Sequence, residues 1–509
     1  MNKRTRTIAR RGSVIVIVIW AVAIAAVIVG AAQVLAFRQA SMGRESIAKV
    51  EARWAARAGI EETLAVLEYH TEKPDPSNAR QMYKDLETVA DGQLASGDWQ
   101  IRHAEDGVEV KGPQDEHAKL NVNTVTRNTL LELDGMTMDV ADAIIDWRDA
   151  DDTPGMMGAE YEFYVNRRLG YEPRNGNFRS VAELELVAGA FPKSVRGEDQ
   201  NLNGRLDPNE NDGSASEPPD DADGFLDAGW SSALTARTTG SLIGSSGEPR
   251  LNLRDATVED LQARLGVTAE QAGALSAFGK SQSARMEMLL TQDLSTLAAG
   301  GGQQSSSQGR GNPMQRGGSG GGSGGGNNGG LSTGNAAKGT DNGKQAFNGG
   351  GGQSQSGTGR QSGRSSSGVG GQQGGNGRMQ SLDQGQLRKI FQEATLDTAD
   401  TPPVGKVNLN TAPPSVLRAL LPDDPISAEA IISLRSASSS GLLAISDLRD
   451  SNRITPQALA ALAAYADTQS YVFTVTSRGR SATTGLEVEI TAVIDRSTLP
   501  ARILEYREQ

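Results

Sequence analysis

The stretch RRGSVIVIVIWAVAIAAVIVGAAQ, residues 10–33, decides the fold, because it determines whether the chain is exported, anchored or assembled through this segment. Residues 14–32 carry no charge and are almost wholly apolar. As a helix rising about 1.5 Å per residue, such a run is long enough to cross a hydrocarbon core of roughly 30 Å. The basic residues before it predict a cytoplasmic N-terminus and a translocated remainder: Lys3, Arg4, Arg6, Arg10 and Arg11.

Three interpretations of this segment are open. The small residues 30–32 are compatible with a cleaved secretory signal, although the apolar core of a signal peptide is normally shorter. A plain signal anchor would hold a periplasmic domain at the membrane. The third interpretation is one long helix, apolar first and amphipathic later, because an apolar stripe continues at helical spacing without a proline: Ile47, Val50, Trp54, Ala58, Ile60, Leu64 and Leu67.

Such a helix resembles the N-terminal helix of type IV pilins and type II secretion pseudopilins. In that family a prepilin peptidase cuts on the cytoplasmic side, after a glycine preceded by basic residues. The match is Arg10-Arg11-Gly12, which implies Ser13 as the new N-terminus, with methylation as in the family.

The fifth residue after this cleavage site departs from most pilins. Ile17 stands where they have a glutamate, whose carboxylate is thought to neutralise the N-terminal amine of a neighbouring subunit. An unpaired charge in that apolar bundle would be costly. The family member that lacks the acid is the K-type minor pseudopilin at the filament tip, so Ile17 implies tip placement.

Two hairpins, far apart in the chain, predict a small antiparallel sheet. Asp106-Gly107 lies between two short runs in residues 97–112, which is a strong hairpin signal. A second pair of runs occupies residues 471–480 and 485–495. The sheet would be built from residues about 98–111 and 471–495, with everything between them inserted. K-type pseudopilins have a large helical domain inserted in this manner.

The inserted region contains an internal repeat. Copies begin at Leu120 (LNVNT) and Val407 (VNLNT), and a weaker one at Leu251 (LNLRD). In each copy, the Thr or Asp after the Asn is expected to cap the first of two helices. The apolar positions of the first copy suit a helix hairpin: Leu130, Leu133, Val140, Ala141 and Ile144.

The repeat also resembles helix-hairpin-helix modules, which bind DNA backbones. Asp134, Asp423 and Asp424 lie at the would-be phosphate contacts and would repel them. The chain has a net charge of -12, which also argues against a nucleic-acid partner. A protein-contact domain made of helix hairpins is therefore favoured over a DNA-uptake protein.

The stretch that follows the first copy is the part most similar to the K-type α-domain. The resemblance rests on Asp146-Trp147, Gly158-Ala159-Glu160, Tyr164, Asn175-Gly176 and Ser180-Val181, followed by Glu183-Leu184. Residues 445–448 of the last copy resemble the end of this stretch. Members of this family bind calcium in the α-domain, and a further candidate metal site here consists of Asp149, Asp151, Asp152 and Glu160.

DQNLNGRLDPNE, residues 199–210, matches the EF-hand calcium loop position by position. Gly204 takes the sharp turn at place 6. The predicted oxygen ligands are Asp199, Asn201, Asn203, the Arg205 carbonyl, Asp207 and the bidentate Glu210. A turn without a metal is the alternative. A second, truncated loop offers Asp221, Asp223 and Asp227 but has Trp230 at the closing place, so its calcium binding is a weaker expectation.

Composition limits the remaining possibilities. The chain has 509 residues, no cysteine and three histidines, none with a partner at catalytic spacing. No phosphate loop, nucleophile elbow or zinc-protease motif is present, so no enzyme is expected. Residues 300–380 are rich in Gly, Ser, Gln and Asn and predict a disordered linker of unknown role.

These observations predict an α+β protein that resembles the K-type minor pseudopilin of type II secretion systems. It would be a single-pass inner-membrane protein, mostly periplasmic, that caps the pseudopilus tip and helps to start its assembly. The expected partners are I-, J- and H-type minor pseudopilins, prepilin peptidase and, beyond them, secreted substrates or the outer-membrane secretin. An unprocessed, membrane-anchored periplasmic binding protein stabilised by calcium is the alternative.

The predicted domain organisation follows from these boundaries. The sequence divides into a leader at 1–12, a pilin helix at 13–70, a first sheet part at 71–112, an inserted α-domain at 113–299 and 381–466, the linker at 300–380, and C-terminal strands at 467–509.

Overall fold

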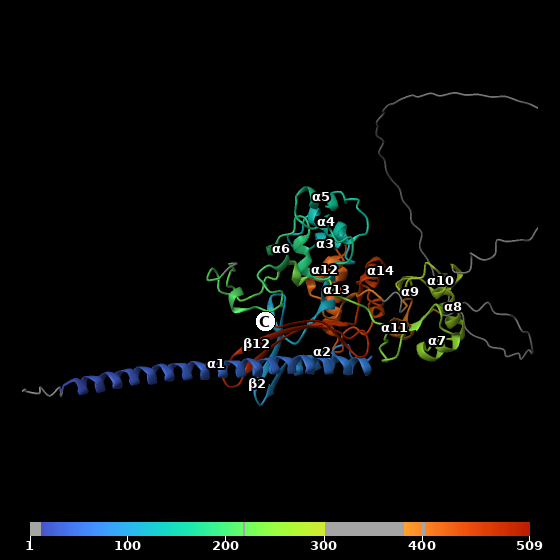
Figure 1. The fold of residues 1–509 in the computed structure, drawn as a ribbon. Helices are drawn as coiled ribbons and strands as arrows, with labels where there is room; N and C mark the ends of the chain where they lie inside the picture. The colour runs from blue at the N-terminus through green and yellow to red at the C-terminus, as the bar shows by residue number, and fades with distance from the viewer. Residues whose placement is uncertain (1–11, 217–218, 301–380, 399–402, 509) are drawn as a thin grey trace, which may run out of the picture. The chain divides into compact units, whose positions relative to one another are not determined.

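A computed structural model describes residues 12–216, 219–300, 381–398 and 403–508 of the chain (Figure 1). The predicted leader up to Arg11 and the glycine-rich tract from 301 to 380 lie outside the described residues. The fold class is α+β, as predicted: one long helix lies on an antiparallel sheet, and a largely helical region is inserted between two of its strands.

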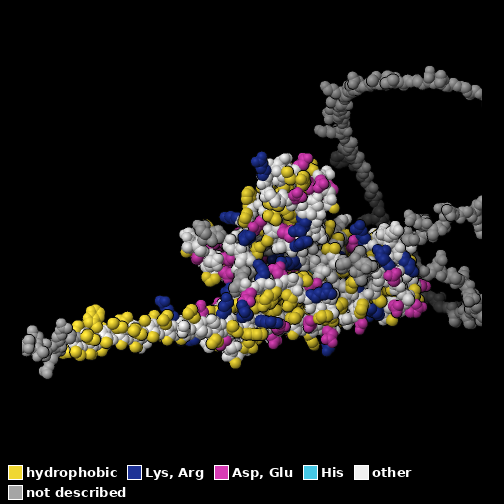
Figure 2. Space-filling model, viewed as in Figure 1, with side chains coloured by type: hydrophobic (Ala, Val, Ile, Leu, Met, Phe, Trp, Pro, Cys, Tyr) yellow, Lys and Arg dark blue, Asp and Glu magenta, His cyan; other side chains and the backbone are white. Residues whose placement is uncertain are grey.

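The first helix, α1 (Gly12–Glu72), is continuous, which confirms the long-helix interpretation. Its apolar first part is exposed along its whole length, and hydrophobic side chains cover it in Figure 2. By length and composition, it is the helix among the described residues that could cross a membrane.

The sheet brings together the two ends of the chain. Its strand order is β1-β2-β11-β12-β13, with β3 paired to β2 and β4 paired to β11. Both predicted hairpins are present, β2–β3 and β11–β12, and β2 pairs antiparallel with β11 across the insertion. The strands β1, β4 and β13 were not predicted. The elements are α2 (Gln81–Val89), β1 (Asp91–Leu94), β2 (Gly97–Glu105), β3 (Val108–Lys111), β4 (Gln114–Asp115), η1 (Glu116–Ala118), β11 (Val472–Ser481), β12 (Glu487–Asp495) and β13 (Arg502–Glu508).

The helix face that meets the sheet is not the one that the apolar stripe predicts. Ile47, Val50 and Trp54 are 60%, 47% and 56% exposed and point away from the sheet. Alanines face it instead, because helix and strand approach closely at Gly479. A Cβ added there would lie 2.1 Å from the carbonyl oxygen of Ala52. Only from Ala58 onward does the stripe turn to the core, in which Ile60 and Leu67 are fully buried.

Where the structure describes it, the inserted region consists of three copies of one module, which confirms the internal repeat. Each module opens and closes with a short strand, and these two strands pair in parallel. We name them module A (residues 120–235), module B (251–395) and module C (407–467).

The helices and strands of the modules have the following bounds. Module A contains β5 (Leu120–Asn121), α3 (Arg127–Leu131), α4 (Met138–Arg148), α5 (Tyr161–Asn166), η2 (Val181–Leu186), α6 (Pro192–Arg196), η3 (Pro208–Glu210), η4 (Gly229–Ser232) and β6 (Leu234–Thr235). Module B contains β7 (Leu251–Asn252), α7 (Val258–Leu265), α8 (Ala269–Gly279), α9 (Met288–Thr291), α10 (Leu294–Gly300), α11 (Gln384–Glu393) and β8 (Ala394–Thr395). Module C contains β9 (Val407–Asn408), α12 (Pro414–Leu420), α13 (Pro425–Ala437), η5 (Ile445–Leu448), α14 (Pro456–Tyr465) and β10 (Ala466–Asp467).

The same side-chain contacts recur in modules A and C. The Asn123 amide exchanges two hydrogen bonds with the Phe178 backbone, at 2.7 and 3.1 Å, and Asn410 does the same with Leu442, at 2.8 and 2.9 Å. Arg148 and Arg435, each at the end of the second hairpin helix, donate to carbonyls of the opening turn. The two copies are therefore similar in structure as well as in sequence.

The predicted helix caps are wrong by two residues. Thr126 and Thr257, not Thr124 and Asp255, accept the capping bond, and module C begins its helix at a proline pair. The reason is a turn after the Asn, closed by the bond from the Val125 N–H to the Asn121 carbonyl at 2.9 Å. Because of this turn, the first helix begins later in the sequence than predicted.

Among the described residues, three hydrophobic cores hold the fold together. One lies between α1 and the sheet, a second is formed by modules A and C together with Leu290 of module B, and a third lies within module B. The predicted hairpin residues Leu130, Val140 and Ile144 are all buried in the shared core. Module A thus supplies a packed base on which its long loops are held.

Candidate metal centres

Three carboxylates from module A converge in one place. Asp146 lies on the last turn of α4, Asp149 follows that helix, and Glu160 immediately precedes α5. One oxygen from each lies within 4.8 Å of the others. Oxygen-only donors at this separation suit a hard divalent cation such as calcium.

Glu160 is the side chain with the strongest indication of a missing counter-charge. It is 4% exposed, and neither of its carboxylate oxygens has a hydrogen-bond partner among the described residues. Burial, followed by the negative charges of Asp146 and Asp149, raises its pKa to about 7. A buried acid without a partner is costly, so a bound cation would relieve both the burial and the repulsion.

The loop between α4 and α5 is shaped around these acids. The Gly155 N–H lies 3.0 Å from both oxygens of Asp146, and the Met157 N–H donates to Asp142 at 3.1 Å. Gly158 passes so close that an added Cβ would lie 1.9 Å from an Asp146 oxygen. The sequence Gly-Met-Met-Gly therefore allows the backbone to wrap the carboxylates.

The structure brings together only part of the predicted site. Asp149 and Glu160 are in the group, but Asp151 and Asp152 are not: Asp151 accepts the Thr153 N–H, and Asp152 accepts from the Asn175 amide. Asp146 takes their place. Its signal in the sequence was the i, i+3 spacing to Asp149 at the end of a helix, which places both acids on one face.

The predicted EF-type loop closes on itself as such a loop requires. Asp199 accepts the N–H groups of Asn203 and Gly204, at 3.0 and 2.9 Å. Glu210, at the closing place, accepts those of Gln200 and Asp207, both at 2.9 Å. Gly204 has φ +67°, the left-handed conformation that place 6 needs.

Burial perturbs the acids of this loop as well. It raises the pKa of Asp199, and it raises that of Glu210 to about 7, with the charges of Asp199 and Asp207 adding to the effect. Asp207 is better compensated, because the Asn201 and Asn203 amides and Arg478 all donate to it. Arg205, expected as a backbone ligand, directs its side chain to Glu109.

The same loop is fastened to the sheet. Arg478 on β11 pairs with both Asp207 and Glu489, and the Asn203 amide donates to Glu489 at 2.8 Å. The Ala104 N–H on β2 donates to the Gly204 carbonyl at 2.6 Å. An ion in this loop would therefore stiffen the junction between module A and the sheet.

The second acidic loop is more open. Asp221, Asp223 and Asp227 are exposed, and each accepts a backbone N–H two residues further on. Sequence reasoning missed Glu198, which receives the N–H groups of Asp221 and Asp227 at 3.4 and 3.3 Å. Calcium binding by Asp221, Asp223 and Asp227 stays a prediction.

The predicted processing and tip residues lie at the start of α1. The helix begins at Gly12, directly before Ser13. Ile17 is 65% exposed within the apolar run, so a neighbouring helix could contact it.

Comparison with known proteins places part of this chain in a family. No curated protein matches it. Among solved structures, a similar chain is found in the crystal structure of the GspK-GspI-GspJ complex from the enterotoxigenic Escherichia coli type 2 secretion system, with 10% sequence identity and a TM-score of 0.41, covering 92% of this chain and 99% of that one. Residues 108–197 match the family described as type II secretion system, protein K, first domain. The segment that holds the three converging carboxylates is thus similar to protein K of type II secretion systems, in agreement with the resemblance expected from the sequence.

Proposed function

We propose that this protein caps the tip of the pseudopilus and helps to start its assembly. The observation that carries the proposal is the position of modules A to C, which are inserted between β4 and β11 of a sheet that lies on α1. A subunit inside a filament must be covered by others above and below it. Three modules beside one sheet are too bulky for such a place, whereas the end of a filament imposes no such limit.

Its partners in this role are other minor pseudopilins of the I-, J- and H-types. The similar solved chain comes from a complex named for GspK, GspI and GspJ, which supports I- and J-type partners. On this chain, Ile47, Val50 and Trp54 form an exposed apolar face of α1 beyond the membrane segment. An apolar helix face at this spacing is suited to packing against another helix.

The same proposal places α1 in the inner membrane, with its N-terminus cytoplasmic and the sheet and modules periplasmic. Prepilin peptidase would cut after Gly12. We assign the chain a structural role and no catalytic one.

Calcium is the cofactor that we propose for two places in module A. The first is the group of Asp146, Asp149 and Glu160, and the second is the loop 199–210. The unpartnered, buried Glu160 supports the first, and the EF-type spacing supports the second. Isothermal titration with calcium checks both, using Glu160→Gln and Glu210→Gln to assign the sites. If neither variant loses a binding event, the two proposed sites are excluded.

The intact mass of membrane-extracted protein, with and without co-expressed prepilin peptidase, tests the assembly role. Loss of residues 1–12, giving a chain that begins at Ser13, is the expected result. An uncleaved chain would make the protein a fixed anchor. Cleavage after Ala32 would make it an exported soluble protein, and the pseudopilin role would fail.

A further inference from the structure

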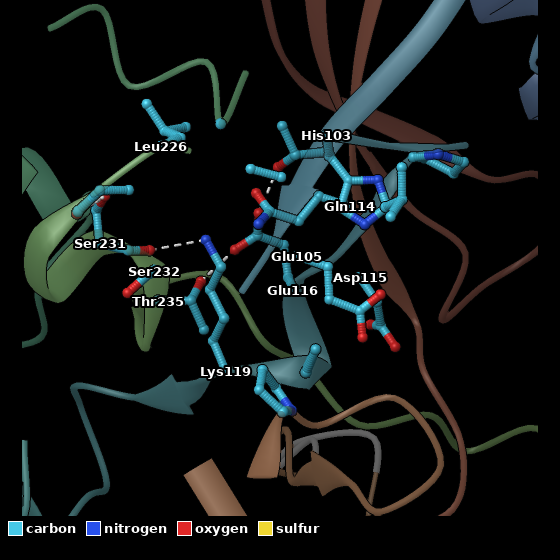
Figure 3. A pocket seen from close by; sticks show the side chains of 18 of the residues that line it. His103, Glu105, Gln114, Asp115, Glu116, Lys119, Leu226, Ser231, Ser232 and Thr235 are labelled. Atoms are coloured by element: carbon cyan, nitrogen blue, oxygen red, sulfur yellow. Dashed lines mark hydrogen bonds between the residues drawn. The ribbon is translucent and has the colours of Figure 1, made fainter. Parts of the chain in front are cut away.

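A large cavity lies between the sheet, module A and the start of module C. Its volume is about 1150 Å³, and its lining comes from β2, η1, the two acidic loops, β6 and the turn before α12. Figure 3 shows Lys119 and Thr235 beside Glu116, and it also shows Gln114, His103 and Glu105 at the cavity. A small-molecule site usually has about 300–1,000 Å³, so this space can accept something larger.

The basic side chains that line the cavity are mostly used within the protein. Lys119 donates to the Ser231 carbonyl at 2.8 Å and lies beside Glu116. Arg237 and Arg507 both pair with Glu505. Burial lowers the pKa of His103 to about 4, so it carries no charge at neutral pH.

The acidic side chains at the rim are not used in this way. Within the described part of the chain, ion pairs involve none of the following: Glu105, Asp106, Glu198, Asp221, Asp223 and Asp227. Residues 105–106 and 221–227 meet at the bond from the Leu226 N–H to the Gly107 carbonyl, 2.9 Å long, and Glu198 joins them by accepting the N–H groups of Asp221 and Asp227. The rim therefore carries an excess of negative charge around one opening, although Arg435 lies near Glu105 and Asp106, and the exposed Lys84 also lines the cavity.

Apolar side chains accompany this charge. Val110, Val181 and Leu226 line the cavity, and Phe225, 52% exposed, stands at the rim. A metal ion would use the carboxylates alone. An occupant that needs both an acidic rim and an apolar wall is a peptide with basic and apolar side chains.

We propose that this cavity is a docking site for a basic, apolar peptide segment of a partner protein. The proposal goes beyond the placement of the chain in the pseudopilus and does not depend on it.

The turn at η2 that lines the cavity has an equivalent in module C, where a helix lies against it. The cavity touches Ser180, Val181 and Ala182 of η2, which correspond to Ala444, Ile445 and Ser446 at η5. In module C, helix α11 covers that turn: Gln384 and Gln392 donate to the Ser446 and Leu443 carbonyls, at 2.6 and 3.0 Å.

The charged contact of α11 has a counterpart in module A. Arg388 on α11 pairs with Asp447, and in module A the equivalent acid, Glu183, is already paired with Arg174. A partner segment would therefore direct its charges to the rim. The sequence of α11 is still a ready probe, because residues 384–392 carry Arg388 and Lys389 as their only charges.

The test uses the full chain in detergent and a fluorescent, end-capped peptide copy of residues 384–392. We expect saturable binding by fluorescence anisotropy that weakens about tenfold between about 50 and about 300 mM salt. Ser232→Trp, at an exposed position of the lining, should abolish binding, whereas Ser433→Trp, exposed and outside the lining, should leave it unchanged. A peptide in which both basic residues are replaced by Glu should not bind.

A conservative variant protects the test against misfolding. Glu105→Gln keeps the shape of an exposed rim residue and should weaken binding about threefold. The absence of saturable binding to the wild type would overturn the proposal, as would binding that Ser232→Trp leaves intact. Complete displacement of the peptide by about 1 mM calcium would identify the rim as a cation site instead, which also overturns it.

Discussion

At the scale of single residues, Glu160 makes the most specific prediction. Its pKa is raised to about 7, so the folded chain without metal binds a proton that the unfolded chain releases near its ordinary value of 4.5. Stability without metal should therefore fall as the pH rises from about 4.5 to about 7. In EGTA at pH 7.5, Glu160→Gln should melt a few degrees higher than wild type, and near pH 4 the two should coincide.

Calcium should reverse the order of the two melting temperatures. The wild type should gain melting temperature on calcium addition by more than Glu160→Gln does, because the amide offers one oxygen and no charge. Thermal unfolding by circular dichroism measures both effects. A variant that melts lower than wild type in EGTA would mean that Glu160 is stabilising without a cation.

The contact between α1 and β11 gives a second prediction at this scale. A Cβ on Gly479 would lie 2.1 Å from the Ala52 carbonyl and 2.2 Å from the Ala56 nitrogen, both backbone atoms. Gly479→Ala should therefore cost about 1–3 kcal/mol of unfolding free energy in urea. The matched control is Gly273→Ala on α8, which has open space and should stabilise by about 0.5–1 kcal/mol. Equal effects of the two changes would exclude close packing as the reason for Gly479.

At the scale of elements, the repeat predicts which arginines matter. Arg435 donates to the Leu409 and Ala412 carbonyls, at 3.1 and 2.5 Å, and is half-buried. Arg435→Ala and its counterpart Arg148→Ala should each cost about 1–3 kcal/mol, because each leaves buried carbonyls unpaired. Arg418→Ala removes an exposed ion pair with Glu429 and should cost under about 1 kcal/mol. Urea unfolding of the three variants compares them directly.

The elements also show which parts of the fold could be predicted from the sequence. The long helix, both hairpins and the repeat were predictable, because each depends on a periodic or local signal: the apolar run, Asp106-Gly107, and the Asn-rich starts. The face of α1 was not predictable, since the choice of alanine over Trp54 depends on Gly479, more than four hundred positions away in the sequence. Asp146 was missed for a similar reason. Its role depends on a loop that returns to it from Gly155 and Gly158.

At the scale of the whole molecule, the glycine-rich tract lies between α10 and α11, inside module B. The cost of closing a flexible loop grows only with the logarithm of its length, by about 0.6 kcal/mol for each doubling. Replacing residues 301–380 by a linker of about 20 residues should therefore stabilise the chain by about 1.2 kcal/mol in urea. A loss of stability would show that the tract contributes contacts of its own.

The last prediction concerns how the molecule meets its partners. The chain contains no cysteine, so a single introduced one reports contacts without interference. Trp54 is 56% exposed on the apolar face of α1, and the adjacent Ala55 is fully buried against the sheet. In cells that contain an I-type pseudopilin with a cysteine in the corresponding part of its helix, Trp54→Cys should form a disulfide-linked heterodimer under mild oxidation. Ala55→Cys should not, because the sheet covers it.

Non-reducing gels and mass spectrometry of the product distinguish heterodimers from dimers of this chain. Exclusive self-dimers would contradict a tip position, since a tip holds one copy, and equal yields from both cysteines would mean that α1 detaches from the sheet.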